Sequence, residues 1–284
     1  MGERLDLIRT ALPARAEWLR RSKSADAGER APWSVRDLGL VVLWTTSIAT
    51  ATILGMIVLR LLVSLLFLVG DMVWLVPEGA YDRLSASVTP YGNVLTDLVV
   101  GAGLYGGLVY AVYRQSVAKY GVSLSALGFR PLSGRTVGQI AIAFVPVTIA
   151  GIAINLASQS VLGTGQRGSQ VSDLTQNMPA SSGNYLILAL LLVVLAPVAE
   201  EVFFRGFLFR LLRARFSSRA TICMTAVAFA ALHGSVVVLP WLLFMGIVFG
   251  ALVEITGSLY SSIMLHAMIN GLTVLGVIIA MSTW

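Results

Sequence analysis

A small set of polar side chains interrupts the apolar runs of this sequence. Charged and hydrogen-bonding groups are costly in apolar surroundings, so the polar residues that remain there are candidates for function. The types present are two adjacent carboxylates, an arginine, an amide and the two histidines that the chain contains. The set consists of Glu200, Glu201, Arg205, His233, His266 and Asn270.

These residue types can hydrolyse a peptide bond. A carboxylate such as Glu200 can accept the proton of a water molecule as a general base. A histidine and an amide, such as His266 and Asn270, can donate hydrogen bonds to the oxygen of a tetrahedral intermediate. Glu200, His233 and His266 can equally hold a divalent metal such as zinc and leave one position open for water. Both mechanisms stay open, and the HExxH signature of soluble zinc proteases is absent.

Helical spacing separates the roles of the two glutamates. Glu201 and Arg205 are four residues apart and can pair on one face of a helix, so we interpret them as a supporting ion pair. Glu200 is turned by about 100° from its neighbour and must face elsewhere. His266 and Asn270 are also four residues apart and project from one face of the last apolar helix.

The composition predicts that helices inside a membrane position these groups. Hydrophobic residues make up 57% of the 284 residues and charged residues 12%, and the mean hydropathy is +0.83. Several runs reach the roughly 20 apolar residues that a helical span requires. We predict an all-α, polytopic membrane bundle of about seven transmembrane helices with the active site inside the bundle. The expected helices cover residues 38–60, 93–113, 137–161, 184–204, 220–237, 240–254 and 258–281.

The distribution of basic residues predicts the orientation of the bundle. Lysine and arginine concentrate in residues 1–36, 114–135 and 205–219, whereas the intervening loops carry one arginine each. By the positive-inside rule, the N-terminus is cytoplasmic in this integral, multi-pass membrane protein, which is a plasma-membrane protein if the source is bacterial. At a rise of about 1.5 Å per residue, the four candidate catalytic groups then share one layer.

Three motifs carry a resemblance to a known family. EEVFFRG (200–206) is similar to an EExxxR motif, FAALH (229–233) to FxxxH, and HAMIN (266–270) to HxxxN. In this order and spacing they resemble the CPBP family of intramembrane proteases, which includes type II CaaX prenyl endopeptidases and bacterial proteins linked to bacteriocin processing, self-immunity and abortive infection. LSALGFR (124–130) also resembles the flanking consensus, and the similarity covers roughly residues 120–281.

The resemblance implies roles for the four candidate catalytic residues. Glu200 corresponds to the general base that activates the hydrolytic water, and His233 assists it or shares the water. His266 and Asn270 resemble the pair assigned to the oxyanion. The family has been described both as metalloproteases and as metal-independent glutamate proteases, so a divalent metal such as zinc remains an open alternative rather than an assigned cofactor.

The resemblance also implies a supporting role for one ion pair and a division of the chain. Glu201 and Arg205 correspond to the pair that supports the site. We expect a cytoplasmic, amphipathic and basic segment at 1–36, additional N-terminal transmembrane helices at 37–119, and the CPBP-like protease core at 120–284.

The leading hypothesis is an intramembrane endopeptidase that hydrolyses a peptide bond of a membrane-associated substrate, by CaaX-type processing or by processing of a bacteriocin or another peptide. The alternatives are a catalytically idle scaffold or immunity protein, and a proton-coupled transporter, for which no internal repeat is found. We expect a membrane-associated peptide or protein and anionic lipids of the cytoplasmic face as partners. The net charge of +6 follows the cytoplasmic loops, and no nucleic-acid partner is indicated.

Overall fold

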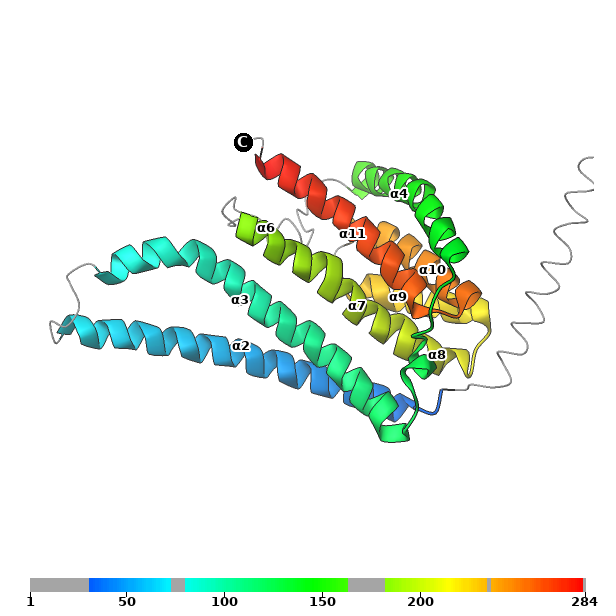
Figure 1. The fold of residues 1–284 in the computed structure, drawn as a ribbon, viewed down its shortest axis with the longest axis horizontal. Helices are drawn as coiled ribbons and strands as arrows, with labels where there is room; N and C mark the ends of the chain where they lie inside the picture. Colours follow the sequence, from blue (N-terminus) through cyan, green and yellow to red (C-terminus); the bar gives the residue numbers. More distant parts are fainter. Residues whose placement is uncertain (1–30, 73–79, 163–181, 234–235, 283–284) are drawn as a thin grey trace, which may run out of the picture.

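The structure is a computed structural model that describes residues 31–72, 80–162, 182–233 and 236–282 (Figure 1). These residues contain helices, turns and short connections but no strand, which confirms the all-α prediction. Six of the helices are regular along most of their length. They are α2 (Val35–Met72), α3 (Ala80–Tyr113), α4 (Gly134–Leu162), α9 (Ser218–Ala231), α10 (Leu239–Thr256) and α11 (Leu259–Ser282).

Residues 182–213 form a seventh, composite helix in which α and π turns alternate. Single π turns inside α-helices occur frequently at functional sites. The short helix that carries Glu200 and Glu201 has a π-helical segment on each side of it. The segments in order are α6 (Ser182–Ala189), η3 (Leu190–Leu195, π), α7 (Ala196–Glu201), η4 (Val202–Leu208, π) and α8 (Phe209–Arg213).

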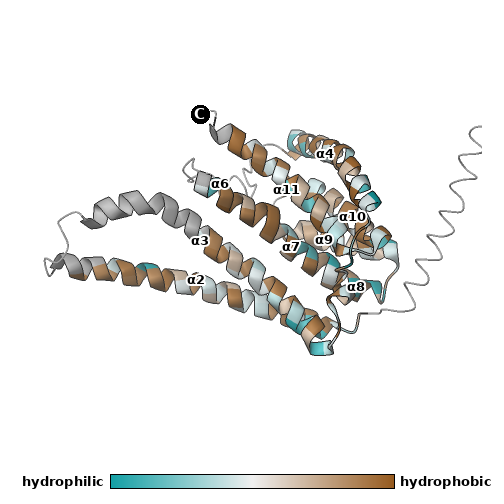
Figure 2. Cartoon of the chain, in the orientation of Figure 1, coloured by the Kyte–Doolittle hydropathy of each residue, from teal (hydrophilic) through white to brown (hydrophobic). Residues whose placement is uncertain are grey.

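Length and composition confirm an integral, multi-pass membrane protein. In the described part of the chain, five helices are long and apolar enough to cross a membrane, and α9 is a shorter apolar helix. Figure 2 shows that hydrophobic residues run along most of the length of these helices. The candidate spans are Val35–Leu66, Gly134–Leu162, Gly183–Arg213, Leu239–Thr256 and Leu259–Ile279.

The seven predicted helices are present in order, but several of their ends differ. The first predicted span, 38–60, is part of a single helix that continues to Met72, and α3 begins at Ala80 instead of residue 93. The span predicted at 220–237 is too long, because α9 ends at Ala231. The residues between α9 and α10 are apolar as well, so hydropathy alone did not reveal the end of the helix.

The helices form two groups that meet at the composite helix (Figure 1). On one side, α2 and α3 form a long antiparallel pair that packs closely, because a Cβ at Gly103 would lie 2.5 Å from Oγ1 of Thr52 and one at Gly107 would lie 2.9 Å from Cγ2 of Ile48. On the other side lie α4, α9, α10 and α11. The composite helix contacts α3, α9, α10 and α11 along its length, so the glutamates lie inside the bundle.

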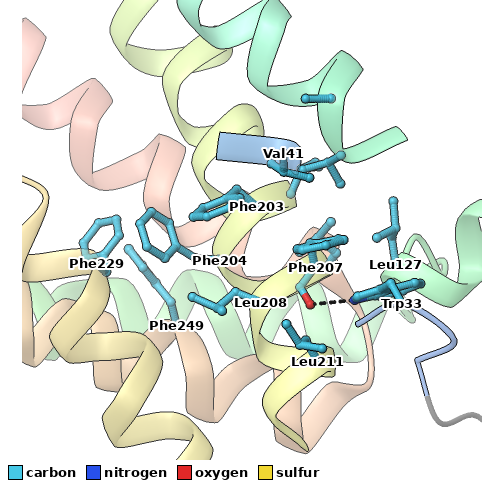
Figure 3. Close-up of a cluster of buried hydrophobic side chains, with 14 of the residues drawn as sticks. Trp33, Val41, Leu127, Phe203, Phe204, Phe207, Leu208, Leu211, Phe229 and Phe249 are labelled. Carbon is cyan, nitrogen blue, oxygen red and sulfur yellow. Dashed lines mark hydrogen bonds between the residues drawn. The ribbon is translucent and has the colours of Figure 1, made fainter. Parts of the chain in front are cut away.

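A cluster of buried aromatic side chains surrounds η4 (Figure 3). Trp33 stacks on Phe207 with ring centroids 5.4 Å apart, and its Nε1 donates a hydrogen bond to the Phe207 carbonyl at 3.1 Å. Phe204, Phe229 and Phe249 pack edge to face on the other part of the cluster. The chain that leads into α2 is therefore fixed directly to the composite helix.

A buried carboxylate ties the start of α2 to the segment after α3. Asp37 accepts hydrogen bonds from the amide and hydroxyl of Ser34 at 2.7 and 2.8 Å, as in a capping box, and from the hydroxyl of Tyr120 at 2.8 Å. Lys119 also donates to Asp37, and this hydrogen bond raises the pKa of Lys119. The basic segments next to the start of α2 and the end of α3 therefore lie together, and Figure 1 shows α8 at the same end of the bundle. Most of the predicted surface segment 1–36 lies outside the described residues.

Candidate active site

Glu201 and Arg205 form a buried ion pair on the composite helix. Nη1 of Arg205 lies 2.9 Å from Oε1 of Glu201, and both side chains are fully buried. Nη2 of Arg205 donates to the carbonyl of Gly246 in α10 at 3.2 Å. Three aromatic rings lie 4.7 to 5.6 Å from the guanidinium carbon, a geometry that favours a cation. These rings belong to Phe204, Phe229 and Phe249.

His266 reaches the same carboxylate from α11. Its Nδ1 lies 3.1 Å from Oε1 of Glu201, and because a carboxylate oxygen accepts, Nδ1 carries the proton. The imidazole stacks on Phe249 with centroids 4.8 Å apart and is 7% exposed. With Nδ1 committed to Glu201, the Nε2 atom of His266 is the one that faces Glu200, at 3.9 Å from Oε2.

His233 lies in the turn that follows α9, two residues beyond the end of the helix, and not within the fifth helix as the spans predicted. Its Nδ1 lies 2.7 Å from the carbonyl oxygen of Phe229. A carbonyl only accepts, so Nδ1 of His233 is also protonated. The Nε2 atom is therefore directed to Glu200, where it lies 3.9 Å from Oε2.

Glu200 is the point at which the two imidazoles converge. Its side chain is 15% exposed, and its Oε2 atom is buried and has no hydrogen-bond partner among the described residues. The 3.9 Å distances to both Nε2 atoms exceed the usual length of a hydrogen bond. Separations of this size between polar atoms are commonly bridged by a small polar molecule such as water.

The metal alternative finds no ready-made site in the described residues. Among them, no group of three or more histidine, cysteine, aspartate or glutamate side chains is arranged to hold a metal ion. Glu200, His233 and His266, the set expected as ligands, therefore do not form such a group.

Asn270 lies one turn beyond His266 on α11 but contacts a different part of the composite helix. Its Nδ2 donates a hydrogen bond of 2.8 Å to the carbonyl of Leu192 in η3. The amide has a second N–H, which makes no hydrogen bond to another described residue. The structure thus brings Glu200, His233 and His266 together and joins Asn270 to the π-helical segment that precedes the glutamates.

Each π-helical segment beside the glutamates has a carbonyl that is bound by a side chain from elsewhere in the chain. In η3 this is the Leu192 carbonyl, bound by Asn270, and in η4 it is the Phe207 carbonyl, bound by Trp33. Side-chain insertion into the backbone ladder is a recognised cause of irregular helix geometry. The orientation of α7 is therefore supported from α11 on one side and from the N-terminal segment on the other.

Sequence reasoning missed two of these contributors. The carbonyl of Gly246 holds Arg205 across 41 positions of sequence, and Trp33 holds Phe207 across 174. Gly246 packs against α9, where an added Cβ would lie 2.7 Å from Cα of Ala226. A backbone carbonyl has no signature in the sequence, and Trp33 stands outside every motif, so neither contact had a local signal.

One protein-family model matches the part of the chain that carries this site. Residues 182–272 match the family model described as Rce1-like, type II CAAX prenyl endopeptidase Rce1-like. No curated protein and no solved structure matches the chain. The matched segment runs from the start of α6 into α11 and includes all six candidate residues. The part of the chain that carries the site is therefore similar to the Rce1-like family, which agrees with the CPBP resemblance of its three motifs.

Proposed function

We propose that the protein is an intramembrane endopeptidase that hydrolyses a peptide bond of a membrane-associated substrate. The observation that carries this proposal is the convergence of two imidazole Nε2 atoms, from His233 and His266, on the buried Oε2 of Glu200, which accepts no hydrogen bond from the described residues. The match of residues 182–272 to the Rce1-like family supports the same reaction class.

Glu200 and His233 orient the attacking water in this proposal. The proton of His233 is on Nδ1, so its Nε2 carries a lone pair that accepts one hydrogen of the water. Oε2 of Glu200 accepts the other hydrogen and takes it as a proton when the water oxygen attacks the carbonyl carbon. The C–O bond forms as the carbonyl π bond breaks, and the negative charge moves to the carbonyl oxygen.

His266 stabilises that oxygen. Its Nδ1–H is held by Glu201, so that Nε2 faces the reacting group and, when it carries a proton, donates to the oxyanion, and the second N–H of Asn270 supplies another donor. With His266 protonated, the charges of Glu200, Glu201, Arg205 and His266 sum to zero. The intermediate collapses when the C–N bond breaks, and the leaving amine takes the proton from Glu200.

We further propose that the substrate is anchored in the bilayer, because the site lies among helices that are long and apolar enough to cross it. A CaaX-type prenylated peptide is the substrate class named by the matched family, and other membrane-anchored peptides present the same peptide bond. We also propose, from the positive-inside rule, that the basic end of the bundle and the N-terminus are cytoplasmic and that anionic lipid binds there.

The test is cleavage of a fluorogenic library of membrane peptides, prenylated and unprenylated, by the purified protein in detergent. Glu200→Gln keeps the shape of the side chain but removes the base, so we expect cleavage to fall by about 100-fold or more. The matched control is Glu254→Gln in α10. Glu254 pairs with Arg213 at 3.3 Å, away from the imidazoles, so its loss should leave cleavage within about twofold of wild type.

Further arms of the same experiment separate the alternatives. Activity that survives a zinc chelator but is lost in Glu200→Gln supports the metal-free mechanism. Loss on chelation that is reversed by added metal would assign Glu200, His233 and His266 as ligands. If wild type and Glu200→Gln were equally inert on every peptide, the protease proposal would be overturned, and proton flux in liposomes would then distinguish a transporter from an idle scaffold.

A further inference from the structure

Helix α3 runs parallel to the composite helix that carries Glu200. Near the start of the contact, a Cβ on Gly101 would lie 2.9 Å from Cδ2 of Leu191, and Leu98 packs against the same cluster. Farther along, α3 contributes Val112 to the buried cluster that includes Phe207. Residue numbers therefore increase in the same direction along both helices, which lie side by side in Figure 1.

Tyr105 stands on the stripe of α3 that makes these contacts. It follows Gly101 by four residues and precedes Val112 by seven, and residues with these spacings share one face of a helix. Its position falls between the contact with η3 and the contact with η4, which is where α7 carries Glu200. The Tyr105 side chain is half-buried at the part of α3 that contacts α7.

Oε2 of Glu200 is buried and has no hydrogen-bond partner among the described residues, and the hydroxyl of the half-buried Tyr105 makes no hydrogen bond to another described residue. A tyrosine packed in a largely apolar helix contact usually finds a partner for its hydroxyl. We propose that Tyr105 is a positioning residue of the site, whose hydroxyl donates a hydrogen bond to the water held by Glu200. This inference rests on the proposed hydrolytic function.

With Tyr105, the site includes a residue outside the segment that matches the Rce1-like family model. Tyr105 belongs to α3, which lies before the matched residues 182–272. The water would then be held by Glu200 and His233 from the Rce1-like segment and by a phenol from the preceding helical pair. The pair formed by α2 and α3 thus contributes to the reaction itself as well as to the packing of the bundle.

Tyr105→Phe tests the inference because it removes one oxygen atom and keeps the ring. We expect kcat to fall by about tenfold, the effect of one positioned hydrogen bond, with KM within about twofold of wild type. The matched control is Tyr110→Phe. Tyr110 lies on the same helix but is 48% exposed and packs on Trp44 of α2, so kcat should not change. A loss of folded protein alone would instead leave kcat per folded molecule at the wild-type value.

A double-mutant cycle gives a readout that does not need cleavage. Thermal midpoints are measured for wild type, Tyr105→Phe, Glu200→Gln and the double variant. If the hydroxyl and the carboxylate share a bound water, the two shifts do not add, whereas additive shifts together with a wild-type kcat in Tyr105→Phe would overturn the inference. If no peptide is cleaved even by wild type, the proposed function fails, and the cycle alone decides whether Tyr105 is coupled to Glu200.

Discussion

Glu201 and His266 are joined by a hydrogen bond of 3.1 Å between two helices, although they lie 65 positions apart in the sequence. The oxygen that accepts it, Oε1, also binds Nη1 of Arg205 at 2.9 Å. Glu201 therefore does more than neutralise a buried arginine, because it also fixes which nitrogen of His266 is protonated and how the ring is turned. Of the two adjacent carboxylates, Glu201 holds the imidazole of His266 in place, and Glu200 faces the Nε2 atom of that imidazole.

Glu201→Gln should destabilise the protein strongly. The substitution leaves the buried guanidinium of Arg205 without its counter-charge, which costs about 3 to 5 kcal/mol in the free energy of unfolding. The measurement is denaturant unfolding in detergent. Glu254→Gln is the control, because its ion pair with Arg213 is partly exposed and should be worth less than about 1 kcal/mol. Equal losses in the two variants would contradict the dual role of Glu201.

Gly246→Ala should weaken both the contact of α10 with α9 and the hydrogen bond to Arg205. The added methyl would lie 2.7 Å from the backbone Cα of Ala226, so the two helices must separate, at a cost of about 1 to 3 kcal/mol. Gly276→Ala in α11 is the control, since its added methyl meets nothing within 4 Å. Thermal unfolding compares the two, and an unchanged midpoint in Gly246→Ala would show that this approach of the helices is not needed.

Trp33→Phe should separate stacking from hydrogen bonding in the attachment of the N-terminal segment. Phenylalanine keeps a ring against Phe207 but lacks the donor, so the buried carbonyl of Phe207 loses its side-chain partner and the free energy of unfolding falls by about 1 to 3 kcal/mol. The control is Trp44→Phe, because Trp44 is 46% exposed. Circular dichroism during thermal unfolding measures both, and indistinguishable midpoints would argue that the indole N–H does not stabilise the fold.

Asn270→Leu should affect both stability and cleavage. The change removes the hydrogen bond to the carbonyl of Leu192, which we expect to cost about 1 kcal/mol. If the second N–H also binds the oxyanion, kcat per folded molecule falls by about 100-fold. Thr273→Ala, whose hydroxyl bonds only to the carbonyl of Ile269 one turn earlier, provides the control. A stability loss with wild-type kcat would assign Asn270 to the support of η3 alone.

The sequence predicted the features of this fold that depend on composition and on local spacing. Long apolar runs gave the helical spans, because hydrocarbon thickness sets their length. The four-residue interval between Glu201 and Arg205 gave an ion pair that the structure contains, because such residues are neighbours on any α-helix.

Features that depend on contacts between distant segments were not predicted. The turn position of His233 was missed because the residues after α9 are as apolar as the helix itself. The hydrogen bond from His266 to Glu201 depends on how two helices are rotated relative to each other, and no local sequence pattern predicts this rotation. The two π-helical segments show the same limit, because each coincides with a carbonyl bound by a side chain from far along the chain.

Those two segments allow the middle of the composite helix to be oriented independently of its ends. A π turn closes over one residue more than an α turn, and one residue corresponds to about 100° of rotation and about 1.5 Å of rise. A regular α-helix of the same length in place of η3 would turn α7 by about 100° relative to α6 and direct Glu200 away from the two histidines. The two π segments thus set the rotation of α7 about the helix axis, and so the direction in which Glu200 faces His233 and His266. The segments α6 and α8 can at the same time keep the rotation that suits their own packing.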